Sequence, residues 1–326
     1  MSIIKKKLQN KRGVALITVL LIISILIAVT VELNRSSRAE IYAAAGISDG
    51  IKLAYIAKSG FYAGSTLLMS SPHDYVSLLD EWARTEELSA KSQGLFPDGY
   101  FVVTIEDEAG KIPLNKLVNG NEYNPDIKAI LLRLLSLPEW ELDERKAGEI
   151  VDAIKDWIDV DDIATDAGAE NSYYATLDQP YAAKNAPLDC IEELLMIKGI
   201  SKELFVGTKE KPGLAQFITA HGDGFININT ASKIVLRSLA PQISSAVADK
   251  MDEYRRSTAD LSNSLWYQKI SGLEGMTIKP GLIAVKSDYF KISSSGKMST
   301  MTQKISGFVK RSTERKYCQV ISWRLE

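Results

Sequence analysis

The chain has 326 residues, of which 45% are hydrophobic and 25% charged, a balance typical of globular protein and sufficient for two compact domains. Its formal net charge of −2 indicates that the chain as a whole does not bind polyanions, so a nucleic-acid role would need a local basic patch. Two histidines and two cysteines exclude a zinc cluster with the usual spacing of Cys and His ligands.

The N-terminal residues predict a membrane anchor. Residues 1–13 carry five basic side chains, and residues 14–31 form an uncharged apolar run of eighteen residues. A helix over that run rises about 27 Å, close to the hydrocarbon thickness of a bilayer. Because a basic flank stays in the cytoplasm, we expect a single-pass protein of the cell inner membrane with its head in the periplasm. A plain signal anchor is an alternative, whereas a cleaved secretory signal fits less well because the apolar run is long.

A small residue, Gly13, stands where the basic leader meets the apolar run. This arrangement resembles the processing site of type IV prepilins and pseudopilins, in which a prepilin peptidase would cut between Gly13 and Val14 and can methylate the new amine. Thr18 would then occupy the fifth mature position, where most such subunits carry a glutamate. That glutamate is thought to neutralise the N-terminal amine of a neighbouring subunit, so an uncharged residue suits a subunit at the tip of a fibre. The alternative is that Thr18 marks a subunit that does not assemble.

Residues 14–70 are predicted to form one helix that ends at Ser70 to Pro72. Its second half has an apolar stripe with members at steps of three and four, the spacing of one helix face. The members of this stripe are Ala54, Ala57, Phe61, Gly64 and Leu68. Such a stripe usually packs on the chain's own sheet, and we also expect Ala54, Phe61 and Leu68 to dock on partner helices.

Strand patterns occur on both sides of a helical block. Residues 71–118 and 282–326 hold the strands, which are predicted at 100–105, 285–293, 301–310 and 316–325. Residues 119–281 hold the helices, which are predicted at 126–136, 143–157, 188–197, 231–239 and 243–256, with Thr230 as the N-cap of the fourth. Strands at both ends pair most simply into one sheet, so the predicted fold is α+β: an N-terminal transmembrane helix and a small antiparallel sheet with a large inserted all-α domain.

An acidic loop is predicted at residues 156–174. Six carboxylates fall within fifteen of its residues, namely Asp156, Asp159, Asp161, Asp162, Asp166 and Glu170. No lysine or arginine lies inside the loop, and Gly168 allows a tight bend. Clustered carboxylates repel each other unless a cation joins them, and calcium takes six to eight oxygen ligands. The composition therefore suits calcium as well as it suits a solvated acidic loop. Catalysis is not expected, because no nucleophile, phosphate-binding loop or metal-ligand histidine accompanies the carboxylates.

Two segments, residues 185–200 and 224–239, look like SAM-like or helix-hairpin-helix modules. Such hairpins often bind DNA phosphates through a Gly-x-Gly turn, but here the turn is Gly199, Ile200 and Ser201. The first segment also carries acidic residues, which repel phosphates. We therefore expect no nucleic acid and assign the modules to packing and protein contacts, with a membrane-anchored competence-type DNA receptor as the alternative.

Five stretches in fixed order resemble the type II secretion system minor pseudopilin K family (general secretion pathway protein K). They are RGVALITVLLII (12–23), EDEAGKIPLNKL (106–117), DWIDVDD with GAENSYY (156–162 and 168–174), KNAPLDCIEELLMIKGI (184–200) and FININTASKIVLRSL (225–239). The family also lacks the usual glutamate near the mature start, which agrees with Thr18.

This resemblance implies a pilin-like domain with a large helical insertion, placed at the tip of the pseudopilus. It implies minor pseudopilins I and J and other pseudopilins as partners, a role in starting fibre assembly, and protein export across the outer membrane. It also implies calcium in the acidic loop, held by Asp159, Asp161, Glu170 and Asn171, with Asp162 and Asp166 as further candidates. A minor pilin of a type IV pilus is a second alternative, and a disulfide between Cys190 and Cys318 stays open.

Overall fold

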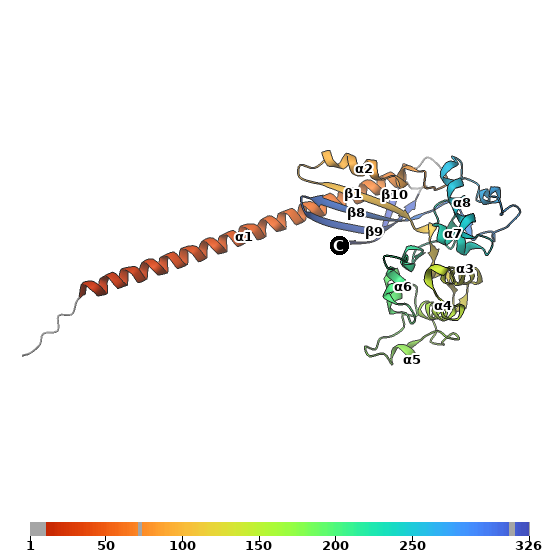
Figure 1. Ribbon diagram of the computed structural model, residues 1–326, viewed down its shortest axis with the longest axis horizontal. Coiled ribbons are helices and arrows are strands. Elements are labelled where there is room, and N and C mark those ends of the chain that lie inside the picture. Colours follow the sequence, from red (N-terminus) through yellow and green to blue (C-terminus); the bar gives the residue numbers. More distant parts are fainter. Residues whose placement is uncertain (1–10, 71–73, 313–316, 326) are drawn as a thin grey trace, which may run out of the picture. The chain divides into compact units, whose positions relative to one another are not determined.

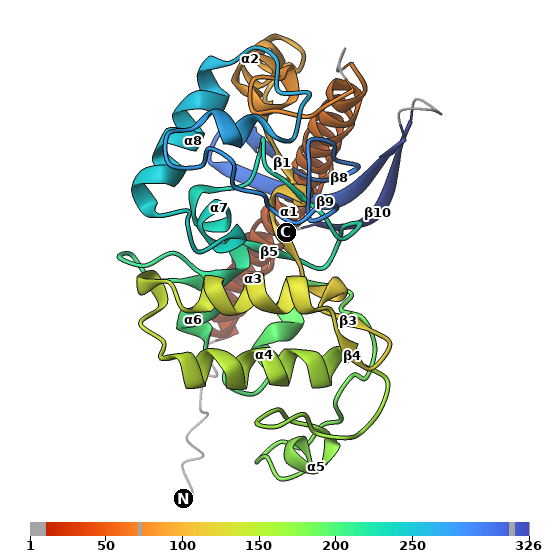
Figure 2. The same cartoon turned by 90° about the vertical axis from the view of Figure 1, so that its right-hand side faces the viewer.

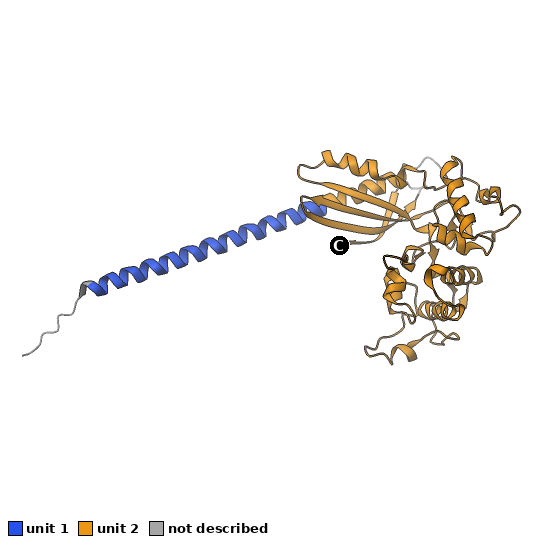
Figure 3. Cartoon of the chain, in the orientation of Figure 1, with its two compact units in different colours: residues 1–55 blue, residues 56–326 orange. Residues whose placement is uncertain are grey.

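The computed structural model describes residues 11–70, 74–312 and 317–325, and its helices and strands are shown in two views (Figures 1 and 2). The chain divides into two compact units, residues 1–55 and residues 56–326 (Figure 3). Most of the predicted leader, residues 1–13, lies outside the described residues, as do Ser71 and Pro72, which were predicted to end the first helix. Both units are described separately below.

Helix α1 runs from Lys11 to Met69 and begins in the first unit. In that unit the side chains from Gly13 to Ser48 are all exposed, including the whole apolar run. By length and composition, α1 is a helix that can cross a membrane, as the sequence predicts. The hydroxyl of Thr18 donates to the carbonyl of Val14 at 2.9 Å, so this polar group is satisfied within the helix.

The second unit contains a four-stranded antiparallel sheet of order β1-β8-β9-β10 (Figure 1). Its strands are β1 (Tyr100–Asp107), β8 (Tyr289–Met298), β9 (Met301–Ser312) and β10 (Tyr317–Leu325). The first strand therefore pairs with strands from the C-terminal end of the chain, which confirms the predicted small antiparallel sheet. The predicted segment 285–293 was placed too early, since β8 begins at Tyr289.

The C-terminal part of α1 packs on this sheet. Phe61 and Leu68 are 2% and 0% exposed and share one core with the sheet residues Phe101 and Phe290. The approach is close: a Cβ at Gly60 would lie 2.2 Å from the Ser294 hydroxyl, so only glycine fits without movement. The predicted docking of Phe61 and Leu68 on partner helices is wrong for this arrangement, because the chain's own sheet covers them. The third residue of that prediction, Ala54, is half-buried in the first unit.

The segment between β1 and β8 contains helices α3 to α8 and has its own large hydrophobic core. Its helices are α3 (Pro125–Leu135), α4 (Glu144–Ile158), α5 (Asn171–Tyr174), α6 (Lys202–Val206), α7 (Lys233–Leu239) and α8 (Ser245–Ser257), with α2 (Glu86–Lys91) preceding β1. Helices α3 and α4 lie side by side (Figure 2). The segment also holds two-residue strands, so it is not all-α as predicted; they are β2 (Ile112–Pro113), β3 (Val118–Asn119), β4 (Glu122–Tyr123), β5 (Ile218–Thr219), β6 (Ile226–Asn227) and β7 (Ile283–Ala284).

Two local predictions in this segment need correction. The predicted helix at 188–197 is a short 3-10 helix, Ile191–Met196. The N-cap of α7 is Ser232, whose hydroxyl accepts from the N–H of Val235, and not Thr230. The second error arises because Thr230 and Ser232 are both short polar residues near the helix start, and tertiary contacts decide which of them caps it.

A buried polar cluster connects the end of β1 to the helical segment. The carboxylate of Asp107 accepts hydrogen bonds from the Ala109 N–H at 2.9 Å and the Asn227 amide at 3.0 Å. It also accepts from the hydroxyls of Thr230 and Ser287, both at 2.6 Å. Burial raises the pKa of Asp107, and these donors oppose that rise. The contact to Asp107 explains why Thr230 does not cap α7.

Both cysteines are free thiols in the structure. Cys190 precedes the 3-10 helix Ile191–Met196, and Cys318 lies on β10, where its thiol donates to the carbonyl of Ser65 at 3.5 Å. The structure therefore favours two separate thiols over the disulfide that the sequence left open.

Candidate metal centre

The C-terminal end of helix α4 carries the first two carboxylates of the acidic loop, Asp156 and Asp159. It begins after Asp143, whose carboxylate accepts from the N–H of Lys146 at 2.7 Å and so caps the helix. It ends at Asp159, where the backbone turns to an extended conformation with ψ of 173°. The side chain of Asp159 stays in the interior and is 0% exposed. The amphipathic packing of α4 thus places a carboxylate at the buried end of a helix.

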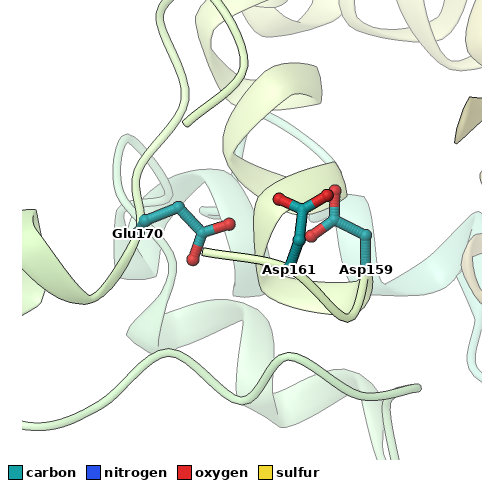
Figure 4. Close-up of side chains that lie close together, drawn as sticks. All are labelled: Asp159, Asp161 and Glu170. Atoms are coloured by element: carbon teal, nitrogen blue, oxygen red, sulfur yellow. The ribbon is translucent and has the colours of Figure 1, made fainter. Parts of the chain in front are cut away.

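Three of the predicted ligand residues converge: Asp159, Asp161 and Glu170 (Figure 4). Each offers a carboxylate oxygen, and these three oxygens lie within 4.8 Å of one another. Two oxygens that bind one calcium ion from opposite sides are at most about 5 Å apart, because each Ca–O distance is about 2.3–2.6 Å. The spacing of the three carboxylates is therefore compatible with one calcium ion between them.

Three buried oxygens of this cluster have no hydrogen-bond donor among the described residues. Glu170 is 1% exposed, and neither of its carboxylate oxygens has a hydrogen-bond partner among the described residues. The same holds, within the described chain, for Oδ1 of Asp159. Buried carboxylates normally accept hydrogen bonds or bind cations, since an unpaired charge in the interior is costly. These oxygens fit a hard cation that takes oxygen ligands, which is the chemistry of calcium.

The protonation of Glu170 reflects the same crowding. Burial, together with the neighbouring carboxylates of Asp156, Asp159, Asp162 and Asp161, raises the pKa of Glu170 to about 8. Burial also raises the pKa of Asp159, although Lys155 opposes this change. A divalent cation would reverse these shifts because it favours the ionised form of each ligand.

The other predicted ligands lie outside this trio. One oxygen of Asp162 accepts from the backbone N–H of Asn171 at 3.2 Å, and the amide oxygen of Asn171 accepts from the N–H of Ala183 at 2.8 Å. Asp166 is exposed and has a left-handed backbone, with φ of 38°. Asp162 and Asn171 thus organise the loop, and the exposed Asp166 is not part of the convergent trio.

Two residues of the site were missed as candidates. The fully buried carboxylate of Asp156 accepts from the N–H of Thr165 at 3.1 Å and shapes the loop. In the sequence, nothing distinguishes Asp156 from the other acidic residues of the loop. Asn185 donates its amide N–H to the carbonyl of Asp161, while its buried amide oxygen has no partner in the described chain. The sequence signal for Asn185 is weak, because it lies fifteen residues beyond Glu170.

Close packing at the bend requires glycine at position 168. A Cβ at this position would lie 1.9 Å from Oδ2 of Asp156. Lys198 secures the same bend from outside, because its ammonium donates to the carbonyls of Ala167 and Gly168 at 3.0 and 3.1 Å. The loop therefore has a defined shape that brings Glu170 back to the end of α4.

Comparison with known proteins shows which family this chain resembles. The family described as "Type II secretion system (T2SS), protein K" matches residues 110–208, a stretch that includes α4 and the whole acidic loop. The Type II secretion system protein K of Aeromonas hydrophila is 25% identical over 307 residues, which cover 87% of this chain and 88% of that protein. The protein of the same name from Pseudomonas aeruginosa is 26% identical over 243 residues, or 71% of this chain and 68% of that protein. This chain is similar to the type II secretion system protein K family along most of its length.

A solved structure supports the same fold. It is the GspK–GspI–GspJ complex from the type 2 secretion system of enterotoxigenic Escherichia coli, and one of its chains aligns with this chain at a TM-score of 0.69 and 19% identity. The alignment covers 86% of this chain and 98% of that chain. The apolar N-terminal helix and the small antiparallel sheet are thereby confirmed. Together, the sequence and structure matches support a minor pseudopilin role in type II secretion.

Proposed function

We propose that this chain occupies the tip of the pseudopilus, starts fibre assembly there with minor pseudopilins I and J, and so supports protein export across the outer membrane. The observation that carries this proposal is the helical segment between β1 and β8, which adds a second core to the sheet domain. Such a bulky addition to the head would leave no room for another subunit above it. A complex with GspI and GspJ in the solved relative supports the choice of partners.

The helical segment is proposed to be a SAM-like packing module for protein contacts, with no catalytic role and no nucleic-acid role. Lys184 supports this assignment, because its ammonium is held by Asp189 and Glu193 at 2.7 and 2.8 Å and is not offered to a phosphate. The turn at Gly199 has φ of 85° but lacks a second glycine. Absence of a mobility shift when the full chain is mixed with DNA would support this assignment, and a shift that weakens steeply with salt would contradict it.

Assembly is proposed to begin with processing. Prepilin peptidase would cut between Gly13 and Val14, and the exposed apolar helix would remain as a single-pass anchor in the inner membrane with the head in the periplasm. Thr18 would suit the tip because its hydroxyl is satisfied within its own helix and needs no charged neighbour. Other pseudopilins would then contact the exposed part of α1, whose buried stripe is already used by the chain's own sheet.

Calcium is proposed as the ion of the acidic loop, with Asp159, Asp161 and Glu170 as ligands. The support is the 4.8 Å spacing of their oxygens and the buried oxygens that lack a partner in the described chain. A bound ion supplies two positive charges among these carboxylates. This chain's own residues fix the loop: Asp156 holds the Thr165 N–H, and Lys198 holds the bend.

Two measurements test the role at the tip. Mass spectrometry of the protein extracted from membranes should show loss of residues 1–13, and Gly13→Leu should retain them while Gly46→Leu, an open position on the same helix, should not. Co-expression of the full chain with minor pseudopilins I and J should give one complex after detergent extraction. A mature chain that still begins at Met1, or three proteins that elute separately, would contradict the proposal.

Thermal unfolding tests the calcium proposal. The melting temperature of the full chain in detergent should rise when calcium replaces a chelator, because the ion binds the folded loop and not the unfolded chain. Glu170→Gln should lose most of this rise, whereas Glu253→Gln, an exposed glutamate on α8, should keep it. Identical melting curves with calcium and with chelator would remove the ion from the proposed function.

A further inference from the structure

A buried lysine lies inside the carboxylate cluster. Lys155 is in the last turn of α4, and its side chain is 9% exposed. Its ammonium contacts Oδ2 of Asp159 at 2.5 Å and the hydroxyl of Thr165 at 2.8 Å. The ring of Tyr123 lies below the ammonium, with 5.6 Å between Nζ and the ring centroid. The lysine thus brings one fixed positive charge to a candidate calcium ligand.

The two oxygens of Asp159 have different surroundings. Oδ2 accepts from Lys155, whereas Oδ1 has no partner in the described part of the chain. Oxygens of Asp161 and Glu170 lie within 4.8 Å of an oxygen of Asp159. A cation bound by the three carboxylates would therefore sit beside the ammonium of Lys155 or push it aside.

We propose that Lys155 is a tethered cation that sets the affinity of the calcium site. Its single positive charge partly neutralises the carboxylates before an ion arrives, so the loop keeps its shape without calcium. An arriving calcium ion must overcome repulsion from this charge, so Lys155 lowers the affinity of the site for calcium. This inference rests on the proposed calcium site and names the residue that regulates it.

A purely structural role predicts a different outcome. A basic residue in the last turn of a helix stabilises the helix through the macrodipole, and Lys155 occupies such a position in α4. In that case loss of its charge would lower stability equally with and without calcium, and the calcium affinity would stay the same. The two roles are therefore separable by measuring affinity and stability together.

The test compares Lys155→Met with Lys128→Met in the full chain purified in detergent. Methionine keeps the length of the side chain and removes the charge. Lys128 is a matched control, because its ammonium lies 3.9 Å from Asp152 and 3.6 Å from the centroid of the Tyr123 ring, and neither of these residues is one of the three ligands. Calcium affinity is measured by isothermal titration in chelator-stripped buffer, and melting temperature is measured with chelator and with calcium.

Lys155→Met should bind calcium at least about tenfold more tightly than the wild type, because removing a positive charge a few ångströms away relieves strong repulsion. Its melting temperature should fall in chelator, and its rise on adding calcium should be larger than that of the wild type. Lys128→Met should change the affinity less than about threefold.

Unchanged or weaker calcium binding by Lys155→Met, with a wild type that binds calcium, would overturn the role of Lys155 and leave the calcium site intact. A wild type and a variant that both fail to bind calcium would overturn the site itself and with it this inference. If Lys155→Met binds calcium and the wild type does not, the ammonium of Lys155 takes the place of the ion among the carboxylates. That result would uphold the role of Lys155 and contradict calcium as the resident ion of the natural protein.

Discussion

Two buried carboxylates, Asp107 and Glu170, differ in what surrounds them. Asp107 is 7% exposed and accepts hydrogen bonds from four donors. Glu170 is 1% exposed, and among the described residues no donor reaches either of its oxygens. The hydrogen bonds to Asp107 satisfy its buried carboxylate. The carboxylate of Glu170 needs a proton or a bound cation instead. Satisfaction of the oxygens, and not the number of acidic residues, separates a structural carboxylate from a candidate ligand.

The direction of the pKa change does not make this distinction. Burial raises the pKa of both groups. The remaining causes have opposite signs: hydrogen bonds from Ser287, Thr230 and other donors oppose the rise at Asp107, while neighbouring carboxylates add to it at Glu170. The following variants test whether the two sites differ as their surroundings indicate.

Asp107→Ala should give the largest loss of stability. It leaves buried donors without an acceptor, and such a loss costs about 3 kcal/mol or more of the free energy of unfolding. The loss should be the same in chelator and in calcium when measured by chemical unfolding. Asp98→Ala removes an exposed carboxylate and should change stability by less than about 0.5 kcal/mol. If the stability loss of Asp107→Ala depended on calcium, Asp107 would not be the purely structural carboxylate that its hydrogen bonds indicate.

Gly168→Ala should be the next largest change. Its Cβ would lie 1.9 Å from Oδ2 of Asp156, so the loop must move, at a cost of about 1–3 kcal/mol. The matched variant is Gly148→Ala in α4, where a Cβ meets open space, and it should stabilise the chain by about 0.5–1 kcal/mol. Measuring both by thermal unfolding separates loop strain from helix propensity, and equal effects would contradict the packed bend.

The pH dependence of stability should reveal Glu170. Its pKa is about 8 in the folded chain, above the ordinary value of 4.5, so the folded state holds this proton more tightly. In chelator its contribution to stability is full below about pH 4.5 and is lost as pH rises to about 8, with a slope up to about 1 kcal/mol per pH unit after screening. Glu170→Gln should lack this slope, and calcium should flatten it in the wild type. A slope that survives in Glu170→Gln would assign the proton to another group.

The smallest effect is expected at Asp166. This exposed carboxylate lies outside the convergent trio, so Asp166→Asn should change calcium affinity less than about threefold. Asp161→Asn removes a charge from the trio and should weaken binding about tenfold or more. Isothermal titration distinguishes the two, and a larger loss at Asp166 would restore the broader ligand set that the sequence suggested.

Several features could be read from local sequence patterns. An apolar run free of charge predicts a membrane-length helix wherever it occurs, because the requirement is set by length and composition. Alternating strands at both ends of the chain predicted that β1 pairs with C-terminal strands. The acidic composition of residues 156–174 suited a calcium-binding loop and a solvated acidic loop equally. Each of these patterns lies within a short stretch of sequence, so it can be recognised without knowledge of the fold.

The tertiary structure decided which groups meet. Composition treats the six acidic residues of the loop alike, but the bend at Gly168 and the end of α4 bring together only Asp159, Asp161 and Glu170. Likewise, the apolar stripe of α1 did not reveal whether a sheet of this chain or a partner helix covers Phe61. Burial and hydrogen-bond satisfaction depend on segments far apart in sequence, so only the folded chain determines them.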